Sequence, residues 1–408
     1  MQCGLLGRKL GHSYSPQIHA MLGSYTYELF EKEPEELEAF LKDGAFRAIN
    51  VTIPYKKDVI PYLDELTTTA RNMGAVNTIV RREDGSLLGH NTDYYGFSSL
   101  LERSGMQVAG KKVLVLGSGG ASQTVCAVLR ERNARVVVIS RSGENNYDNI
   151  GCHEDAALIV NTTPVGMYPH TGISPVDLDL FQKLECVLDV VYNPARTKLL
   201  LDAEARGIPC ENGLWMLVAQ AKEAAEYFTG SAISDECIER IHRVLRSQME
   251  NIVLIGMPGC GKSTIGAILS EKTGKKLLDA DAEIVKAAGK PIPEIFADSG
   301  EPGFRAIETQ VLAELGKQSG CIIATGGGCV TKCENFPSLH QNGTIFWIKR
   351  EIALLPKDGR PLSLRNNLQK MYEVRKPMYE SFADFAIEND GSPEETASKI
   401  IQLWEERR

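Results

Sequence analysis

The chain has 408 residues, which is too long for one ordinary core and predicts two or three domains. Its composition, 43% hydrophobic and 24% charged residues, is typical of a globular protein, and no apolar run is long enough to span a membrane. A formal net charge of −8 without a long basic run argues against a nucleic-acid partner. The N-terminus has no signal-peptide pattern and the ten cysteines form no CxxC pair, so we expect reduced thiols and a cytoplasmic protein.

Polar segments interrupt the apolar runs of the first hundred residues. "GHSYSP" places two serines in one turn, and "NVTIPYKKD" places a threonine and a lysine just after a predicted strand. "GAVNTI" and "GHNTDYYGF" add an asparagine and an aspartate. Small hydroxyl and amide groups suit a polyhydroxylated ligand, and a lysine and an aspartate can form a proton-handling pair. The residues concerned are Ser13, Ser15, Thr52, Lys56, Asn77 and Asp93.

A dinucleotide-binding turn is predicted next. Residues 111–122, "KKVLVLGSGGAS", indicate a buried strand, a glycine turn and the start of a helix, although Ser122 replaces the last glycine of G-x-G-x-x-G. The following predicted strand, 134–140, ends at Ser140, and Arg141 and Ser142 come directly after it. An NAD enzyme would typically carry an acidic residue there, whereas these side chains suit a 2′-phosphate, so we expect NADP.

The alternation of strands and helices continues through "ALIVNTTP", "CVLDVVYNP" and a predicted helix over 214–228. With "NTTPVGM", "DVVYNP" and "NGLWMLVAQA", residues 1–247 resemble shikimate dehydrogenase. The resemblance implies a Rossmann-type NADP-binding domain, residues 101–213, inserted into a substrate-binding and catalytic domain, residues 1–100 and 214–248.

The resemblance also implies roles for individual residues of this sequence. Lys56 and Asp93 would be the catalytic pair. The substrate would be bound by Ser13, Ser15, Thr52, Asn77, Tyr192 and Gln220. The cofactor would be lined by Gly117, Ser118, Gly119, Gly120, Ala121, Ser140, Arg141, Ser142, Val190 and Gly213.

A second unit is expected to begin near residues 248–250, where a predicted helix over 234–248 passes into "NIVLIGMPGCGKST". Gly256, Gly261, Lys262 and Ser263 satisfy G-x-x-x-x-G-K-[ST], and the strand before and helix after them support a phosphate-binding loop. In such a loop the lysine reaches the β- and γ-phosphates and the hydroxyl binds Mg²⁺.

The segments after this loop indicate what accepts the phosphate. No N-K-x-D guanine-reading segment is present; instead the chain carries "LLDAD", "IFADSGEPGFRAIE", "ATGGGCV", "RPLS" and "VRKPMY". In this order, and together with the loop, they make residues 251–408 resemble shikimate kinase, with the domain expected over 249–408. One departure is that Leu355, Pro356 and Lys357 stand where the family often has an arginine stacked on adenine.

Roles again follow from the resemblance. Shikimate would be bound by Asp281, Arg305, Gly326, Gly327, Gly328 and Arg375, with two arginines suited to its carboxylate. Lys262, Asp281 and the lid arginine Arg360 would be catalytic, and Ser263 and Asp279 would hold Mg²⁺. ATP would be cradled by Gly259, Cys260, Gly261, Lys262, Ser263 and Thr264. Glu308 is interpreted as a surface ion-pair residue.

The sequence therefore predicts an α/β protein: a substrate domain, a Rossmann-type domain, and a P-loop kinase domain with a parallel sheet. The expected function is NADPH-dependent reduction of 3-dehydroshikimate to shikimate, followed by MgATP-dependent phosphorylation of shikimate. Three alternatives stay open: a quinate or aminoshikimate dehydrogenase, a kinase for another small alcohol, and a nucleotide-sensing protein with an inactive dehydrogenase. The sequence does not indicate the oligomeric state.

Overall fold

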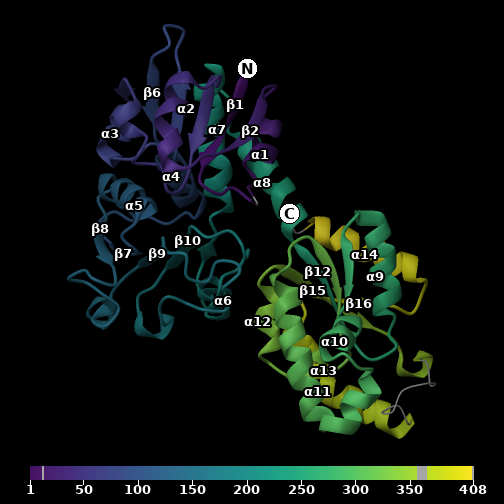
Figure 1. Ribbon diagram of the computed structural model, residues 1–408. Coiled ribbons are helices and arrows are strands. Elements are labelled where there is room, and N and C mark those ends of the chain that lie inside the picture. Colours follow the sequence, from purple (N-terminus) through teal and green to yellow (C-terminus); the bar gives the residue numbers. More distant parts are fainter. Residues whose placement is uncertain (12, 356–364, 407–408) are drawn as a thin grey trace. The chain divides into compact units, whose positions relative to one another are not determined.

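The computed structural model describes residues 1–11, 13–355 and 365–406 (Figure 1). The chain divides into two compact units. Unit 1 comprises Met1–Val165, Ser174–Tyr192 and Asp202–Val244, and unit 2 comprises Gly166–Ile173, Asn193–Leu201 and Leu245–Arg408. The predicted α/β class is confirmed, because parallel sheets and helices alternate in both units.

The first sheet of unit 1 is mixed and runs in the order β2-β1-β3-β5-β6-β4. Its strands are β1 Gln2–Gly7, β2 Thr26–Glu31, β3 Ala48–Val51, β4 Glu65–Leu66, β5 Thr78–Arg81 and β6 Leu87–His90. Strand β5 is antiparallel to both β3 and β6, and the other pairs are parallel. The carboxyl ends of β3 and β6 therefore lie near each other on either side of β5, although Val51 and His90 are 39 positions apart in the chain.

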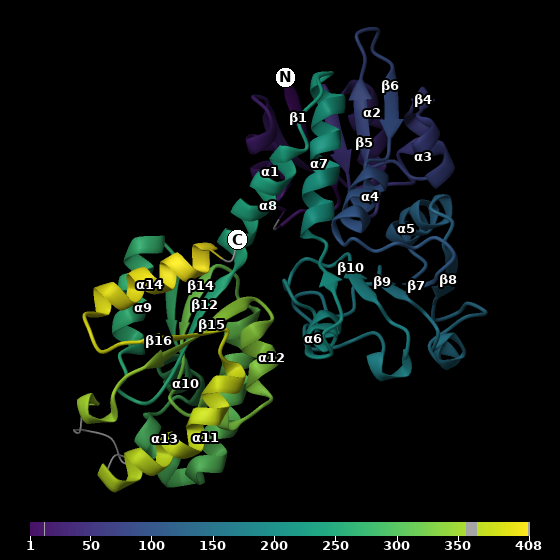
Figure 2. The same ribbon diagram turned by 180° about the vertical axis from the view of Figure 1, so that it is seen from behind.

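Six helices accompany this sheet: α1 Ser15–Leu22, α2 Leu37–Asp43, α3 Thr68–Met73, α4 Asp93–Arg103, α7 Leu214–Thr229 and α8 Glu236–Met249. Helix α7 packs against α1, α4, β3 and β5, so a late segment of unit 1 returns to its first sheet (Figure 2). Apolar residues at helical spacing explain this position, because α7 buries Leu214, Val218, Ala221, Ala225 and Phe228.

The second sheet of unit 1 is fully parallel, in the order β11-β10-β9-β7-β8. Its strands are β7 Lys112–Leu116, β8 Arg135–Ile139, β9 Leu158–Asn161, β10 Cys186–Asp189 and β11 Cys210–Glu211. Helix α5, Gly120–Glu131, follows β7, and α6 spans Lys198–Ala205. Strands β9 and β10 are buried along their whole length, as is usual for parallel strands covered on both faces.

Unit 2 contains a third sheet, also fully parallel, in the order β13-β14-β12-β15-β16. Its strands are β12 Asn251–Ile255, β13 Lys276–Asp279, β14 Cys321–Ala324, β15 Gly343–Lys349 and β16 Phe385–Glu388. The helices are α9 Lys262–Thr273, α10 Ala280–Ala288, α11 Ile292–Lys317, α12 Asn335–His340, α13 Arg365–Phe382 and α14 Pro393–Glu406. Strand β12 is central and wholly buried, so the loop that follows it opens at the carboxyl edge of the sheet, where ligands bind in open α/β sheets.

Short 3₁₀ segments complete the secondary structure: η1 Pro34–Glu36, η2 Ile60–Tyr62, η3 Ile150–His153, η4 Leu178–Leu180, η5 Cys329–Thr331 and η6 Ile352–Leu354. Among the described residues, no helix combines the length and the apolar character that crossing a membrane requires.

Helix α11 is interrupted at Gly300, whose φ of 64° and ψ of −172° are not helical. Glycine adopts this left-handed conformation without the strain that a side chain would add. Pro302 follows, and proline is well tolerated in the first turn of a helix because its missing N–H would have no partner there. The second segment of α11 therefore starts anew just before Arg305, which sets the direction of that side chain.

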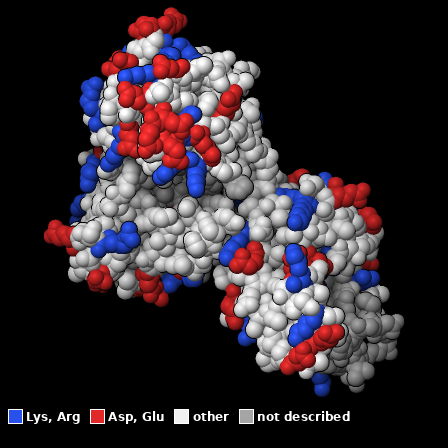
Figure 3. Space-filling view, viewed as in Figure 1, with Lys and Arg blue, Asp and Glu red and all other residues white. Residues whose placement is uncertain are grey.

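Charged side chains of both signs are scattered over the face shown in Figure 3, and the broadest acidic patch on that face lies on unit 1. The whole chain carries a formal charge of −8. An anionic small molecule therefore depends on local cations at its binding site rather than on the overall field of the protein.

Candidate functional site

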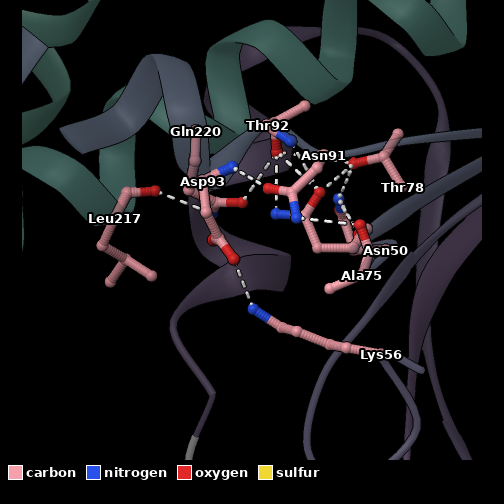
Figure 4. Close-up of polar contacts among 10 residues, drawn as sticks. Asn50, Lys56, Ala75, Thr78, Asn91, Thr92, Asp93, Leu217 and Gln220 are labelled. Carbon is pink, nitrogen blue, oxygen red and sulfur yellow. Dashed lines mark hydrogen bonds and ion pairs between the residues drawn. The ribbon is translucent and has the colours of Figure 1, made fainter. Parts of the chain in front are cut away.

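Lys56 and Asp93 form an ion pair in unit 1 (Figure 4). Lys56 lies just beyond β3, Asp93 is the first residue of α4, and Nζ lies 2.6 Å from Oδ2. The lysine side chain is 27% exposed and the aspartate 15%. A pair that is sheltered yet open to one side can hold and move a proton at a bound ligand.

A buried polar network fixes the start of α4 and so aims Asp93 (Figure 4). Asn77 Oδ1 accepts a hydrogen bond of 2.7 Å from the backbone N–H of Thr92, and Asn77 Nδ2 donates to Thr92 Oγ1 at 3.0 Å. Asn91 Oδ1 accepts from the backbone N–H of Asp93 at 3.1 Å, and its Nδ2 donates to the carbonyl of Ala75 at 2.9 Å. Amide side chains satisfied on several sides hold a rigid geometry.

Helices α4 and α7 approach closely at Gly96. A Cβ atom at this position would lie 2.8 Å from the carbonyl oxygen of Met216 and 3.0 Å from Cβ of Gln220. Glycine is thus what permits the contact. It brings Gln220, whose Oε1 accepts from Thr92 Oγ1 at 3.3 Å, to the same polar network as Asp93.

These side chains line one cavity of about 530 Å³. All predicted substrate-binding residues of unit 1, both members of the catalytic pair and three predicted cofactor residues lie on its wall: Ser13, Ser15, Thr52, Lys56, Asn77, Asp93, Ala121, Val190, Tyr192, Gly213 and Gln220. Burial raises the pKa of Tyr192, which keeps its phenol protonated and able to donate a hydrogen bond. The structure brings together residues that lie as much as 207 positions apart, Ser13 and Gln220.

Sequence reasoning missed several residues on this wall. Asn50 lies there and donates to Thr78 Oγ1 at 3.2 Å and to the carbonyl of Asn77 at 3.4 Å. Its position two residues before Thr52 was an available signal, because both lie at the end of the same strand. The wall also includes Lys9, for which the sequence offered no motif, and Met216 and Leu217, which lie in "NGLWMLVAQA" but were given no role there.

A second cavity of unit 1, of about 710 Å³, lies at the glycine turn between β7 and α5. Of the predicted cofactor residues, its wall contains Gly117, Ser118, Gly119, Ser140 and Arg141. Gly120 begins α5, and neither it nor the exposed Ser142 is on this wall.

The glycine turn is shaped for a close-lying ligand. Gly117 has a φ of 104°, and a Cβ there would lie 2.9 Å from Thr162 Oγ1. At Gly119 and Gly120 a Cβ would instead enter open space, so the backbone N–H groups at the start of this 12-residue helix are accessible. Accessible N–H groups and the positive end of a helix suit a pyrophosphate, so these residues fit a dinucleotide cofactor.

The phosphate-binding loop of unit 2 runs from β12 to α9. Gly256, Gly259 and Gly261 have φ values of 144°, 83° and 102°, a conformation that favours glycine. Lys262 Nζ donates to the backbone carbonyls of Gly256 at 2.8 Å and Met257 at 3.1 Å, so its ammonium lies inside the loop. Backbone N–H groups turned the same way can surround phosphate oxygens.

The side chain of Cys260 packs within this loop, close to Gly256 and Lys262. It is fully buried, its Sγ lies 3.8 Å from Lys262 Nζ, and its carbonyl accepts from Asn389 Nδ2 at 2.7 Å. Only its backbone can therefore contribute to nucleotide binding.

The two side chains expected to hold Mg²⁺ lie within hydrogen-bond distance of each other. Ser263 Oγ donates to Asp279 Oδ2 at 2.9 Å, and Asp279 Oδ1 caps α10 by accepting from Asp281 N–H at 3.0 Å. Among the described residues, no group of three or more His, Cys, Asp and Glu gathers as a metal site would require. Nucleotide-bound Mg²⁺ typically takes one or two protein ligands in addition to phosphates and waters, so a hydroxyl and a carboxylate fit it.

Arg305 and Glu308 form a buried ion pair beside the glycine turn after β14. Nη1 lies 2.6 Å from Oε2, and the two side chains are 8% and 0% exposed. Burial raises the pKa of Glu308, and the guanidinium of Arg305 opposes that rise. The interpretation of Glu308 as a surface ion-pair residue is wrong, because the second segment of α11 turns this carboxylate into the core.

The glycines after β14 make room for these charged groups. A Cβ at Gly328 would lie 2.1 Å from Nη2 of Arg305. A Cβ at Gly326 would lie 2.7 Å from Glu308 Oε1 and 3.1 Å from Asp281 Oδ1. The turn therefore places an arginine and two carboxylates around one small volume.

Arg375, on α13, completes this volume. Its Nη1 donates to the carbonyl of Gly327 at 3.0 Å, and the hydroxyl of Tyr379 donates to the same oxygen at 2.5 Å. A cavity of about 510 Å³ joins the phosphate loop to this volume. Its wall contains Gly259, Gly261, Lys262, Ser263, Thr264, Asp279, Asp281, Arg305, Glu308, Gly326, Gly327, Gly328 and Arg375. The predicted lid residue Arg360 lies outside the described residues, as do Pro356 and Lys357.

Comparison with known proteins identifies both halves of the chain. The family model for the shikimate dehydrogenase substrate binding domain matches residues 5–79, and the model for shikimate kinase matches residues 258–405. Shikimate dehydrogenase (NADP(+)) from Clostridium perfringens strain SM101 is 39% identical over 266 residues, which cover 60% of this chain and 97% of that protein.

Solved structures agree with this similarity. A chorismate mutase/shikimate 5-dehydrogenase fusion protein from Clostridium acetobutylicum is 36% identical, with a TM-score of 0.57 over 60% of this chain and 96% of its own. Shikimate 5-dehydrogenase from Thermus thermophilus, solved with NADP(H) and shikimate, is 31% identical, with a TM-score of 0.54 over 60% of this chain and 99% of its own. The chain therefore belongs to the shikimate dehydrogenase family, and in residues 258–405 it also carries a shikimate kinase domain.

Proposed function

We propose that this chain is a bifunctional enzyme that performs two consecutive reactions. Unit 1 reduces 3-dehydroshikimate to shikimate with NADPH, and unit 2 transfers the γ-phosphoryl group of MgATP to the 3-hydroxyl of shikimate. The observation that carries the proposal is the presence, in one chain, of a Lys56–Asp93 pair on a polar cavity and a phosphate loop joined to an arginine-lined cavity.

In unit 1, Lys56 is proposed to supply the proton of the reduction. NADPH, when bound, supplies the hydride that adds to the carbonyl carbon. The carbonyl oxygen gains negative charge at that moment, and the Lys56 ammonium donates a proton to it, forming the hydroxyl. Asp93, 2.6 Å away, holds the ammonium in position and stabilises its charged form before the transfer. Ser13, Ser15 and Asn77 offer hydrogen bonds to the substrate's carboxylate and hydroxyls.

In unit 2, positioning and charge neutralisation are proposed to do most of the work, as in other phosphoryl transfers. Asp281 accepts a hydrogen bond from the attacking hydroxyl and orients it. Arg305 and Arg375 hold the substrate carboxylate, since a guanidinium pairs with a carboxylate through two parallel hydrogen bonds. Mg²⁺ on Ser263 and Asp279 would neutralise phosphate charge, and Lys262 would leave its loop carbonyls to meet the β- and γ-oxygens.

The choice of NADP over NAD is supported by Arg141 on the wall of the second cavity and by the relatives named for NADP⁺. A second candidate function rests on a specific likeness. A quinate dehydrogenase from Corynebacterium glutamicum, solved with NAD, is 28% identical, with a TM-score of 0.55 over 60% of this chain and 99% of its own. Quinate oxidation with NAD⁺ is therefore the reaction to test against the first.

One assay tests both activities. The purified chain is supplied with 3-dehydroshikimate, NADPH and MgATP, and all products are followed by chromatography. We expect shikimate and shikimate 3-phosphate, one NADP⁺ per shikimate formed and one ADP per phosphate transferred. Omitting NADPH should prevent the formation of both products. Adding shikimate in the absence of NADPH should restore the formation of shikimate 3-phosphate. A chain that binds both nucleotides without turnover would support a nucleotide-sensing role, and faster oxidation of quinate than of shikimate would support the second candidate.

We also propose a division into domains and a location in the cell. The first is the division into a substrate domain of residues 1–100 and 214–248, a cofactor domain of residues 101–213, and a kinase domain of residues 249–408. The second is a cytoplasmic location, which suits ten cysteines that are all free thiols in the structure.

A further inference from the structure

The segment between β8 and β9 forms a compact loop held by its own asparagines. The backbone N–H of Ser140 donates to the carbonyl of Asn145 at 3.1 Å, which closes the loop at its start. Asn149 Oδ1 accepts from the backbone N–H of Asn146 at 2.8 Å, and Asn149 Nδ2 donates to the carbonyl of Glu144 at 2.8 Å. His153 Nε2 contacts Asn145 Oδ1 at 3.0 Å. This network spans residues 140–153 and gives the loop one defined shape.

The loop presents Tyr147 on the wall of the second cavity, beside Arg141. Tyr147 is half-buried, and burial raises the pKa of its phenol while the nearby guanidinium of Arg141 opposes that rise. Elsewhere on the wall are Pro164, Val165 and Pro175. This end of the cavity therefore combines one aromatic ring and apolar side chains with one exposed guanidinium.

The parts of a dinucleotide differ in what they require. Its pyrophosphate suits the N–H groups of the glycine turn, which lines the same cavity. A 2′-phosphate requires a cation. The adenine is a flat ring with little charge, and it gains most from an aromatic face or an apolar wall. Only Tyr147 supplies an aromatic face among the residues lining this cavity.

We propose that Tyr147 is the platform on which the adenine of the cofactor stacks, with Arg141 beside it to bind the 2′-phosphate. This inference rests on the proposed dehydrogenase function and deepens it, because it names how the adenosine end is recognised. The asparagine network positions the ring before the cofactor arrives, so little order has to be created on binding.

The test compares cofactors with and without adenosine. The unmodified chain is first shown to reduce 3-dehydroshikimate with NADPH, since failure there would overturn the proposed function and not this inference alone. In Tyr147→Ala the KM for NADPH should rise by about tenfold, the size of a lost base–aromatic stack. Reduction with the reduced form of nicotinamide mononucleotide, which has no adenosine, should stay unchanged. Tyr147→Phe should restore the NADPH value, because the ring rather than the hydroxyl does the stacking.

Control variants separate a binding role from a structural one. Tyr168→Ala removes a tyrosine that is 43% exposed and lies on none of the three cavities described above, so its KM for NADPH should not change. Asn149→Ala removes two loop hydrogen bonds and should raise the KM for NADPH but not that for the mononucleotide. An unchanged KM in Tyr147→Ala would overturn the inference. The inference would also be overturned if Tyr147→Ala raised the KM for NADPH and for the mononucleotide equally, or if Tyr147→Phe did not restore the KM for NADPH.

Discussion

Arg305→Met should destabilise unit 2, because it leaves the carboxylate of Glu308 buried without its partner. Nη1 and Oε2 lie 2.6 Å apart, and the carboxylate side chain has no exposed surface. Removing one member of a buried ion pair costs about 3–5 kcal/mol. Methionine keeps most of the apolar stem beside the ring of Phe304, which lies 5.2 Å from the guanidinium carbon. The loss in the free energy of unfolding therefore comes from the missing charge more than from missing side-chain volume.

Adding Glu308→Gln to Arg305→Met removes the second charge as well. No uncompensated charge then remains in the core, and the double variant should recover to within about 2 kcal/mol of the unmodified chain. Shikimate saturation should behave differently. Arg305 is proposed to bind the substrate carboxylate directly, so the KM for shikimate should stay raised in both variants.

Urea unfolding at pH 7 measures the free energies of unfolding. The chain has three tryptophans, and Trp347 and Trp404 lie in unit 2, so a Trp215→Phe background makes fluorescence report that unit. A single variant as stable as the unmodified chain would refute the role of the ion pair. A double variant that also regains normal shikimate saturation would show that Arg305 does not bind the substrate.

Four further outcomes are expected. Lys56→Ala should lower kcat for reduction by about 10²–10⁴-fold while the kinase rate is kept, and near-normal reduction would remove this residue from the mechanism. Arg141→Asp should lower or reverse the ratio of kcat/KM for NADPH over NADH, and equal use of both cofactors by the unmodified chain would contradict the assignment. Arg375→Ala should weaken shikimate binding by about 2–5 kcal/mol with little change in the KM for ATP, and unaltered shikimate saturation would place the carboxylate elsewhere. Because burial raises the pKa of Glu308 above its ordinary 4.5, its stabilising contribution is full below pH 4.5 and is lost as the pH rises through the raised pKa. The free energy of unfolding of the unmodified chain, measured relative to that of Glu308→Gln, should therefore fall as the pH rises through this range. A difference between the two proteins that stays constant with pH would show that the pKa of Glu308 is not raised.

Features encoded in consecutive residues could be predicted from the sequence. The phosphate loop between β12 and α9 was predicted because its glycines, Lys262 and Ser263 lie within eight residues and the flanking strand is a continuous apolar run. The glycine turn after β7 was predicted for the same reason, although Ser122 stands where G-x-G-x-x-G has its last glycine. Local backbone requirements leave a local signature.

Features that depend on tertiary packing were not predictable in the same way. Glu308 looks like an ordinary helical carboxylate, and its burial follows from the bend at Gly300 and from the glycine turn after β14 that lies against it. Asn50 and Thr92 stand within two residues of positions that motifs did mark, yet their roles appear only when β3, β5 and β6 lie side by side. Hydrogen bonds across strands have no periodic signature in the chain.

The contact at Gly96 has a consequence for how this enzyme can change over generations. The residue touches no ligand in any proposed step, yet it sets the distance between the helix that begins with Asp93 and the helix that carries Gln220. A single added methyl group there would meet the backbone of Met216 and would have to push the two helices apart. We therefore expect substitutions at this position to be tolerated as poorly as substitutions in the catalytic pair itself. A mutant library meant to broaden the substrate range should treat Gly96 as part of the active site.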